Sequence, residues 1–246
     1  MLKETVEKLY EQFSTYKAVR PLDICTYCCM SIENEELLAS LLVREIPKDL
    51  LAEYNDGAST AKTPIDELKH FLPRYLELIS QFEFPTHSAE IALRRLTPYD
   101  ETEWSEQELK LLRQFSLDYF EYCLAVYPLP EYIQIDSVII MLWHSQFEIK
   151  DLLLLWETDK SKESILHYKD LMFYGFKQHN PSKLNNPFGG KPIYDFLRQW
   201  LDKEEVIKHF SGAIEEIILQ EESLEEPDLD ELNLLYEILA SKKNIH

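Results

Sequence analysis

The sequence predicts an all-α protein, either an irregular multi-helix bundle or an α-solenoid of HEAT-like helix pairs with short connections. The chain of 246 residues contains only five glycines, too few for the many tight turns of sandwiches and barrels. Apolar residues recur at intervals of three and four along most of the chain, which is the period of one helix face. Short segments separate these stripes, as is typical of antiparallel neighbouring helices. No fixed repeat period is evident.

The length and composition are sufficient for a large hydrophobic core. Hydrophobic residues make up 45% of the 246 positions, and a chain of this size is near the upper end for one core. We therefore expect one all-α domain over residues 1–246, or two helical halves of about 1–128 and 129–246.

Proline and glycine mark the limits of the first helices. Helices are predicted over residues 2–16, 33–42 and 47–56. The first must end before Pro21. Pro47 suits the first position of the third helix, and Gly57 suits its carboxyl end.

The next two helices begin at capping signals. Thr63 is placed to cap a helix over 64–79, with Pro64 at its first position and Asp66 in its first turn. Residues Ser105–Glu108 form a capping box for a helix that continues to residue 126. Pro128 ends that helix.

The second half continues the helical pattern. Helices are predicted over 133–147, 149–158, 162–177, 191–201, 203–221 and 227–241, and residues 180–190 are predicted to be the longest loop. Ten acidic residues lie between Glu215 and Glu237 with no lysine or arginine among them. Because apolar residues keep helical spacing there, we expect two packed helices with a solvated acidic face, not a disordered tail. That face is also a candidate surface for a basic partner.

The charge of the chain excludes some functions and favours another. The formal net charge is −20 and the isoelectric point is about 4.7. Such a surface repels nucleic acid and anionic membranes, and it favours a basic protein partner. The charged, amphipathic N-terminus lacks a secretory signal, and no apolar run reaches about 18 residues. We therefore expect a soluble cytoplasmic protein with reduced cysteines.

Three of the four cysteines lie within five residues, at Cys25, Cys28 and Cys29. The Cys25–Cys28 spacing matches half of a structural zinc site, but no second pair follows. The nearest suitable histidine is His70, so Cys25, Cys28 and His70 are a candidate zinc ligand set, with Cys29 as a possible fourth ligand. The alternatives are buried thiols that act as small hydrophobic residues and a redox pair, for which the expected βαβ context is absent.

His70 belongs to a second unusual stretch. Pro73 lies inside the helical stripe and predicts a kink. Asp66, His70 and Arg74 share one helix face. This row could orient His70 for ligation, or for catalysis with Arg74 holding an anion; the alternative is a row of salt bridges beside a structural bend. Since the chain contains no HExxH, GxSxG or Ser-His-Asp order, the sequence as a whole argues against an enzyme.

Several short motifs carry a resemblance. They are Cys25-Thr26-Tyr27-Cys28, Val43-Arg44-Glu45-Ile46-Pro47 and His70-Phe71-Leu72-Pro73-Arg74. Over residues 23–125 the chain resembles a family of uncharacterised bacterial proteins with an early CxxC motif and an HFLPR helix. The resemblance implies a bacterial cytoplasmic protein, and it favours a site shared by the cysteines and the histidine. It implies no particular activity.

These observations predict a protein-interaction or scaffold protein with an acidic surface and no required cofactor. One alternative is a small zinc-binding protein that uses Cys25, Cys28 and His70. A second alternative is an immunity-type protein that neutralises a basic partner, for which charge is the argument.

Overall fold

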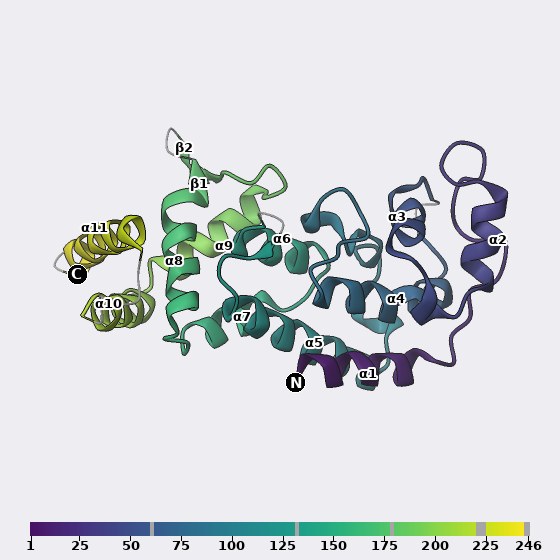
Figure 1. Ribbon diagram of the computed structural model, residues 1–246, viewed down its shortest axis with the longest axis horizontal. Helices are drawn as coiled ribbons and strands as arrows, with labels where there is room; N and C mark the ends of the chain where they lie inside the picture. The colour runs from purple at the N-terminus through teal and green to yellow at the C-terminus, as the bar shows by residue number, and fades with distance from the viewer. Residues whose placement is uncertain (60–61, 131–132, 178–179, 220–224, 244–246) are drawn as a thin grey trace. The chain divides into compact units, whose positions relative to one another are not determined.

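A computed structural model describes residues 1–59, 62–130, 133–177, 180–219 and 225–243 (Figure 1). Helices form almost all of the regular structure, which confirms the predicted all-α class. The chain divides into two compact units. Unit 1 comprises Met1–Tyr119 with Met141–Glu148, and unit 2 comprises Phe120–Ile140 with Ile149–His246.

Unit 1 contains four complete α-helices and several short 3-10 turns in its described part. The α-helices are α1 (Leu2–Phe13), α2 (Ile32–Ser40), α3 (Lys48–Asp56) and α4 (Ile65–Ser80). The 3-10 turns are η1 (Val43–Glu45), η2 (Ala89–Ile91), η3 (Arg94–Leu96) and η4 (Glu101–Glu103). Helices α5 (Glu106–Leu124) and α6 (Ile135–His144) each contribute residues to both units. Helix α1 packs against α4, so their apolar stripes form much of this core.

The predicted helix starts are correct to within one or two residues. The capping box at α5 is confirmed, because the Ser105 N–H donates to Glu108 Oε2 (2.7 Å) and the Glu108 N–H donates to Ser105 Oγ (3.3 Å). Pro47 and Pro64 occupy N-cap positions, one residue earlier than predicted. The Thr63 hydroxyl caps no helix; it donates instead to Asp23 Oδ2 (2.7 Å). A long-range partner has therefore replaced the local one.

Unit 2 is built around stacked aromatic rings. Its remaining elements are α7 (Ile149–Trp156), α8 (Lys162–Tyr174), β1 (Phe176–Lys177), β2 (Asn180–Leu184), α9 (Lys191–Leu201), α10 (Glu204–Ile218) and α11 (Glu226–Lys243). Tyr168 stacks on Phe210 with 3.6 Å between ring centroids, and Trp156 stacks on Trp200 at 5.3 Å. These buried rings join α7, α8, α9 and α10.

The strands β1 and β2 correct two sequence-based predictions. The helix predicted over 162–177 ends at Tyr174, and part of the loop predicted over 180–190 is a strand. The strands pair antiparallel, with Phe176 opposite Leu184. Phe176 and Leu184 are buried, and β2 packs against α9. This packing between distant segments overrides the local helical period.

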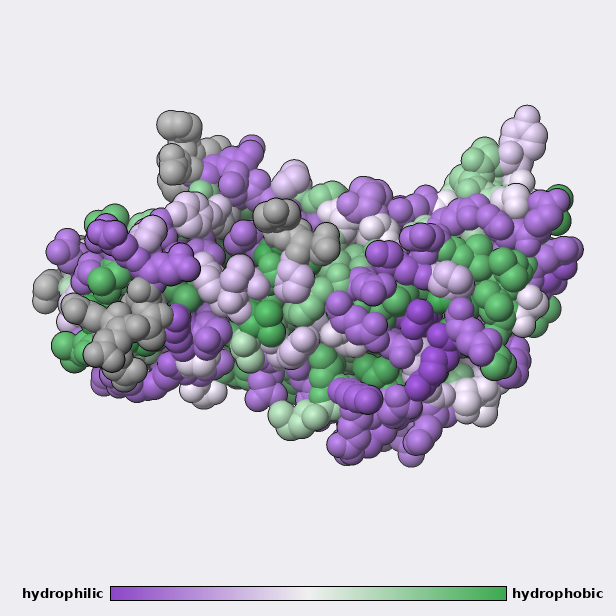
Figure 2. Space-filling model, in the orientation of Figure 1, coloured by the Kyte–Doolittle hydropathy of each residue, from purple (hydrophilic) through white to green (hydrophobic). Residues whose placement is uncertain are grey.

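Helices α10 and α11 pack together as predicted, and their outer acidic residues include exposed Glu215, Glu216 and Asp230. The end of the predicted helix over 203–221, and Glu222 after it, lie outside the described residues. Hydrophilic residues cover much of the face drawn in Figure 2, with smaller hydrophobic areas between them. Of the helices described, none combines the length and apolar character needed to cross a membrane.

Candidate metal centre

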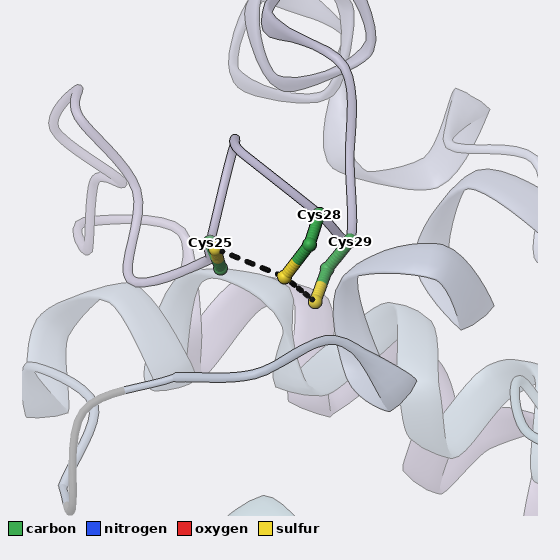
Figure 3. A group of neighbouring side chains, drawn as sticks. All are labelled: Cys25, Cys28 and Cys29. Carbon is green, nitrogen blue, oxygen red and sulfur yellow. Dashed lines mark hydrogen bonds between the residues drawn. The ribbon is translucent and has the colours of Figure 1, made fainter.

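Residues Cys25–Cys29 form a tight turn before α2, which we call the thiol turn (Figure 3). The N–H groups of Cys29 and Met30 both donate to the Cys25 carbonyl, at 3.2 Å each. Ser31 then caps α2 by accepting from the Asn34 N–H (3.1 Å). The turn therefore has its own backbone hydrogen bonds, independent of any ion.

The segment after α3 holds the thiol turn in place. The Cys25 N–H donates to the Ala58 carbonyl (2.8 Å), and the Ala58 N–H donates to Cys29 Sγ (3.3 Å). Gly57 permits this close approach, because a Cβ there would lie 2.0 Å from Ile24 Cδ1 and 3.1 Å from Cys29 Cβ. Ile24 and Met30 are buried on either side of the turn, and so anchor both of its ends.

The three cysteine side chains converge. Figure 3 shows the side chain of Cys28 between those of Cys25 and Cys29. Cys28 Sγ lies 3.3 Å from each of the other two sulfurs. All three sulfurs lie within 4.8 Å of one another. Zn–S bonds of about 2.3 Å would place two ligand sulfurs about 3.8 Å apart in a tetrahedral site. The sulfurs of Cys25 and Cys29 therefore lie about 0.5 Å closer to Cys28 Sγ than in such a site.

The thiols differ in proton affinity because of their mutual contacts. A hydrogen bond with Cys28 and the backbone N–H groups of Tyr27 and Cys28 lower the pKa of the Cys25 thiol. Cys28 contacts both other thiols, and these contacts raise its pKa to about 12. The contacts therefore favour the thiolate at Cys25 and the protonated thiol at Cys28. A bound cation would offset the repulsion that keeps Cys28 protonated.

The thiol turn is accessible to solvent. Cys28 is exposed, and Cys25 and Cys29 are partly exposed. The hypothesis that these cysteines are core residues is therefore wrong. That description fits Cys123, which is buried in α5 and belongs to unit 2.

The structure brings Cys25 and Cys28 together with Cys29. His70 is not in this group and contacts the Tyr16 carbonyl instead. The group of converging ligand atoms contains the three cysteines and not His70. His70 lies on α4 with Nδ1 3.0 Å from the Tyr16 carbonyl oxygen, and burial lowers its pKa. The sequence predicted Cys29 as a fourth ligand beside Cys25, Cys28 and His70, whereas the structure makes it one of three converging thiols. The signal for including it was the clustering of three cysteines on one short turn.

The row Asp66, His70 and Arg74 forms no shared site. Arg74 Nε donates to the Ile46 carbonyl (2.8 Å) and Arg74 Nη1 pairs with Glu77 (2.5 Å). Asp66 is exposed at the start of α4. His70 and Arg74 therefore hold α4 against the neighbouring segments at Tyr16 and Ile46, while Asp66 faces solvent.

Comparison with protein-family models found no match, and comparisons with curated proteins and with solved structures also found none. The geometry of the thiol turn is therefore the basis for a functional proposal.

Proposed function

We propose that this protein binds a thiophilic metal ion, zinc foremost, through the thiolates of Cys25, Cys28 and Cys29. The observation that carries the proposal is the convergence of three sulfurs within 4.8 Å on one solvent-accessible turn. Thiolate ligands favour zinc and monovalent copper over harder cations. Backbone N–H groups beside Cys25 add stabilisation to a thiolate, as outer hydrogen bonds do in metal sites.

Such a site differs from a structural zinc site. All three ligands come from five consecutive residues, so a bound ion would close a single turn and join no distant segments. Closing a loop this short restricts few conformations of the unfolded chain. Three protein ligands also leave the fourth position of a tetrahedral ion open, as in zinc sites that bind exogenous ligands. The ion therefore serves ligand binding more than folding.

Elemental analysis of protein purified without chelator or affinity metal tests the proposal. We expect about one zinc per chain in the unmodified protein, and loss of the metal in Cys25→Ser and Cys28→Ser variants. Cys123→Ala is the matched control, since it removes the buried thiol of unit 2. A metal-free protein, or one whose metal content is unchanged by Cys28→Ser, contradicts the proposal.

A His70→Asn variant distinguishes a ligand set of three cysteines from the set Cys25, Cys28 and His70. Asparagine keeps a donor for the Tyr16 carbonyl. With three cysteines as ligands, the metal content stays unchanged in this variant. Loss of metal would instead restore the ligand set predicted from the sequence, Cys25, Cys28 and His70.

A second function is a role as an interaction or scaffold protein for a basic protein partner. The specific observation is the net charge of −20 together with exposed acidic side chains on α10 and α11. An immunity-type protein that neutralises a basic toxin is one form of this function. Complementary charge speeds association and selects partners, so binding should weaken steeply as salt rises.

Charge-neutralising variants test this second function. The first removes acids of the C-terminal helices through Glu215→Gln, Glu226→Gln and Asp230→Asn. The control removes the same charge from unit 1 through Glu11→Gln, Glu45→Gln and Glu101→Gln; all six side chains are exposed. Partner binding should fall in the first variant and persist in the control. Binding that is independent of salt, or equal in both variants, contradicts this function.

A further inference from the structure

A cleft of unit 1 begins at the thiol turn. It has a volume of about 560 Å³ and is lined by residues that include Cys29, Gly57, Ala58, Thr63, Arg94 and Arg95. This size falls within the range of small-molecule sites. Cys29 is both a wall of the cleft and one of the three converging thiols. The cleft therefore adjoins the thiol turn at Cys29.

Arg94 offers an anion contact in this cleft. Its Nε donates to the Asn55 carbonyl (3.0 Å), and its Nη2 donates to the same oxygen. These bonds hold the guanidinium in one orientation, while the side chain stays 38% exposed. Nη1 makes no hydrogen bond among the described residues. The nearest carboxylate oxygen, Asp56 Oδ1, is 4.0 Å from Nη2, which is too far for a hydrogen bond.

Arg95 adds positive charge without offering a contact. It is buried with its guanidinium 4.0 Å from the centre of the Tyr54 ring. Its Nη1 donates to Thr63 Oγ1 (2.9 Å), and its nearest carboxylate, on Asp23, is 4.0 Å away. Two guanidinium groups therefore border one cleft of a chain whose net charge is −20. Asp56 also lines the cleft, so the contact for an anion is offered by the Arg94 guanidinium itself and not by a net positive charge.

We infer that this cleft binds a small thiol that carries a carboxylate, with the carboxylate paired to Arg94 and the sulfur in the open fourth position of the metal ion. The inference rests on the proposed metal site. A fourth thiolate satisfies the preference of the ion for sulfur. The Arg94 guanidinium supplies the charge-assisted hydrogen bond that distinguishes a carboxylate from a neutral group.

The test uses two probes that differ only in the group presented to Arg94. Mercaptoacetate carries a thiol and a carboxylate, and 2-mercaptoethanol carries a thiol and a hydroxyl. The full-length protein is loaded with Co²⁺, whose visible absorption reports its ligands in a tetrahedral thiolate site. Each thiol is titrated while the absorption is followed, and the cobalt content is measured afterwards. We expect mercaptoacetate to bind about tenfold more tightly than 2-mercaptoethanol.

Three variants assign the difference to the cleft. In Arg94→Gln the preference for mercaptoacetate should disappear while cobalt affinity stays unchanged. In Asp56→Asn the preference should increase, because the nearest competing carboxylate is removed. Arg44→Gln is the control, since Arg44 pairs with Glu7 on the surface of unit 1 and does not line the cleft; its preference should equal that of the unmodified protein.

The outcomes separate this inference from the proposal on which it rests. A chain that binds no cobalt overturns the metal site and the inference together. Cobalt binding with equal affinity for the two thiols overturns the inference alone. A preference for mercaptoacetate that persists in Arg94→Gln and is unchanged in Asp56→Asn also overturns it, because the carboxylate would then contact another group.

Discussion

Two buried lysines, one in each unit, are neutralised in different ways. Lys69 on α4 has a side chain only 6% exposed, and its Nζ pairs with a single carboxylate, Glu108 Oε2, at 2.9 Å. Lys169 on α8 has a side chain 3% exposed, and its Nζ lies 2.5 to 3.2 Å from three carboxylates. These belong to Asp170, Asp228 and Glu231.

The surroundings explain the number of partners. In unit 1 the rings of Tyr16 and Trp104, each 4.9 Å from Lys69 Nζ, supply cation–π attraction, and the Glu103 carbonyl accepts a further hydrogen bond at 2.9 Å. In unit 2 burial by itself would lower the pKa of Lys169. Hydrogen bonds to Asp228 and Glu231 outweigh that effect, so the pKa of Lys169 lies above its ordinary value.

The comparison shows what removal of each lysine would leave behind. Unit 1 would retain one buried carboxylate, and unit 2 would retain three carboxylates around one position. Both lysines are engaged in structural ion pairs. The thiol turn is different, since the thiols of Cys25 and Cys29 both contact the thiol of Cys28.

The largest expected effect is that of Lys169→Met. Removing the Lys169 cation costs about 3 to 4 kcal/mol of unfolding free energy, because repulsion among the three carboxylates is no longer offset. The cost stays below the highest values for buried ion pairs because these carboxylate side chains are 15 to 31% exposed. Urea unfolding at neutral pH measures this loss of unfolding free energy. Lys208→Met, at an exposed position of α10, is the control; a loss no larger than in that control would show that the cluster does not stabilise unit 2.

Lys69→Met should cost less, about 2 to 3 kcal/mol. The remaining Glu108 carboxylate keeps the hydrogen bond from the Ser105 N–H (2.7 Å) and can take up a proton. The same urea measurement applies. A loss equal to or greater than that of Lys169→Met would contradict the idea that the number of stranded carboxylates sets the cost.

The pH dependence of the Lys69–Glu108 pair gives a third, smaller effect. Burial raises the pKa of Glu108, but the Ser105 N–H and Lys69 outweigh it, so the folded pKa lies below the ordinary 4.5. The pair therefore stabilises the fold fully above about pH 4.5, and this stabilisation is lost as pH falls through the folded pKa. Glu108→Gln should cost about 1 to 2 kcal/mol at pH 7, and the difference from the unmodified protein should shrink below pH 4.5. A difference in unfolding free energy that stays constant with pH would contradict a stabilising Lys69–Glu108 ion pair.

The smallest effect is expected for Cys28→Ser in metal-free protein. Cys28 is exposed, and its thiol hydrogen-bonds to the other two thiols, so the urea midpoint should stay unchanged within error. This variant removes the proposed function while Lys169→Met removes structure. A clear loss of stability in Cys28→Ser would assign the thiol turn a structural role.

Local signals explain which elements were predictable. The capping box at Ser105–Glu108 acts within four residues, and the structure reproduces it. The strand Asn180–Leu184 was missed because its pairing with Phe176–Lys177 and its packing against α9 involve other segments. The same reasoning applies to Thr63, whose capping role was displaced by Asp23 and Arg95.

In the candidate site, too, local features were predictable and features that depend on distant segments were not. Cys25, Cys28 and Cys29 were predictable as a cluster because they lie within five consecutive residues, which keeps them close in any fold. The sequence did not predict that His70 lies against the Tyr16 carbonyl, and it did not predict the cleft that Arg94 lines. Both features depend on how distant segments pack.

The chain by itself determined the all-α class, most helix limits and the clustering of the three cysteines, because helical period, capping and short turns depend on neighbouring residues. The tertiary structure decided which charges are buried, that the cysteines are accessible to solvent, and that an arginine-bordered cleft begins at Cys29. These features arise from contacts between residues far apart in sequence, and no local pattern encodes them.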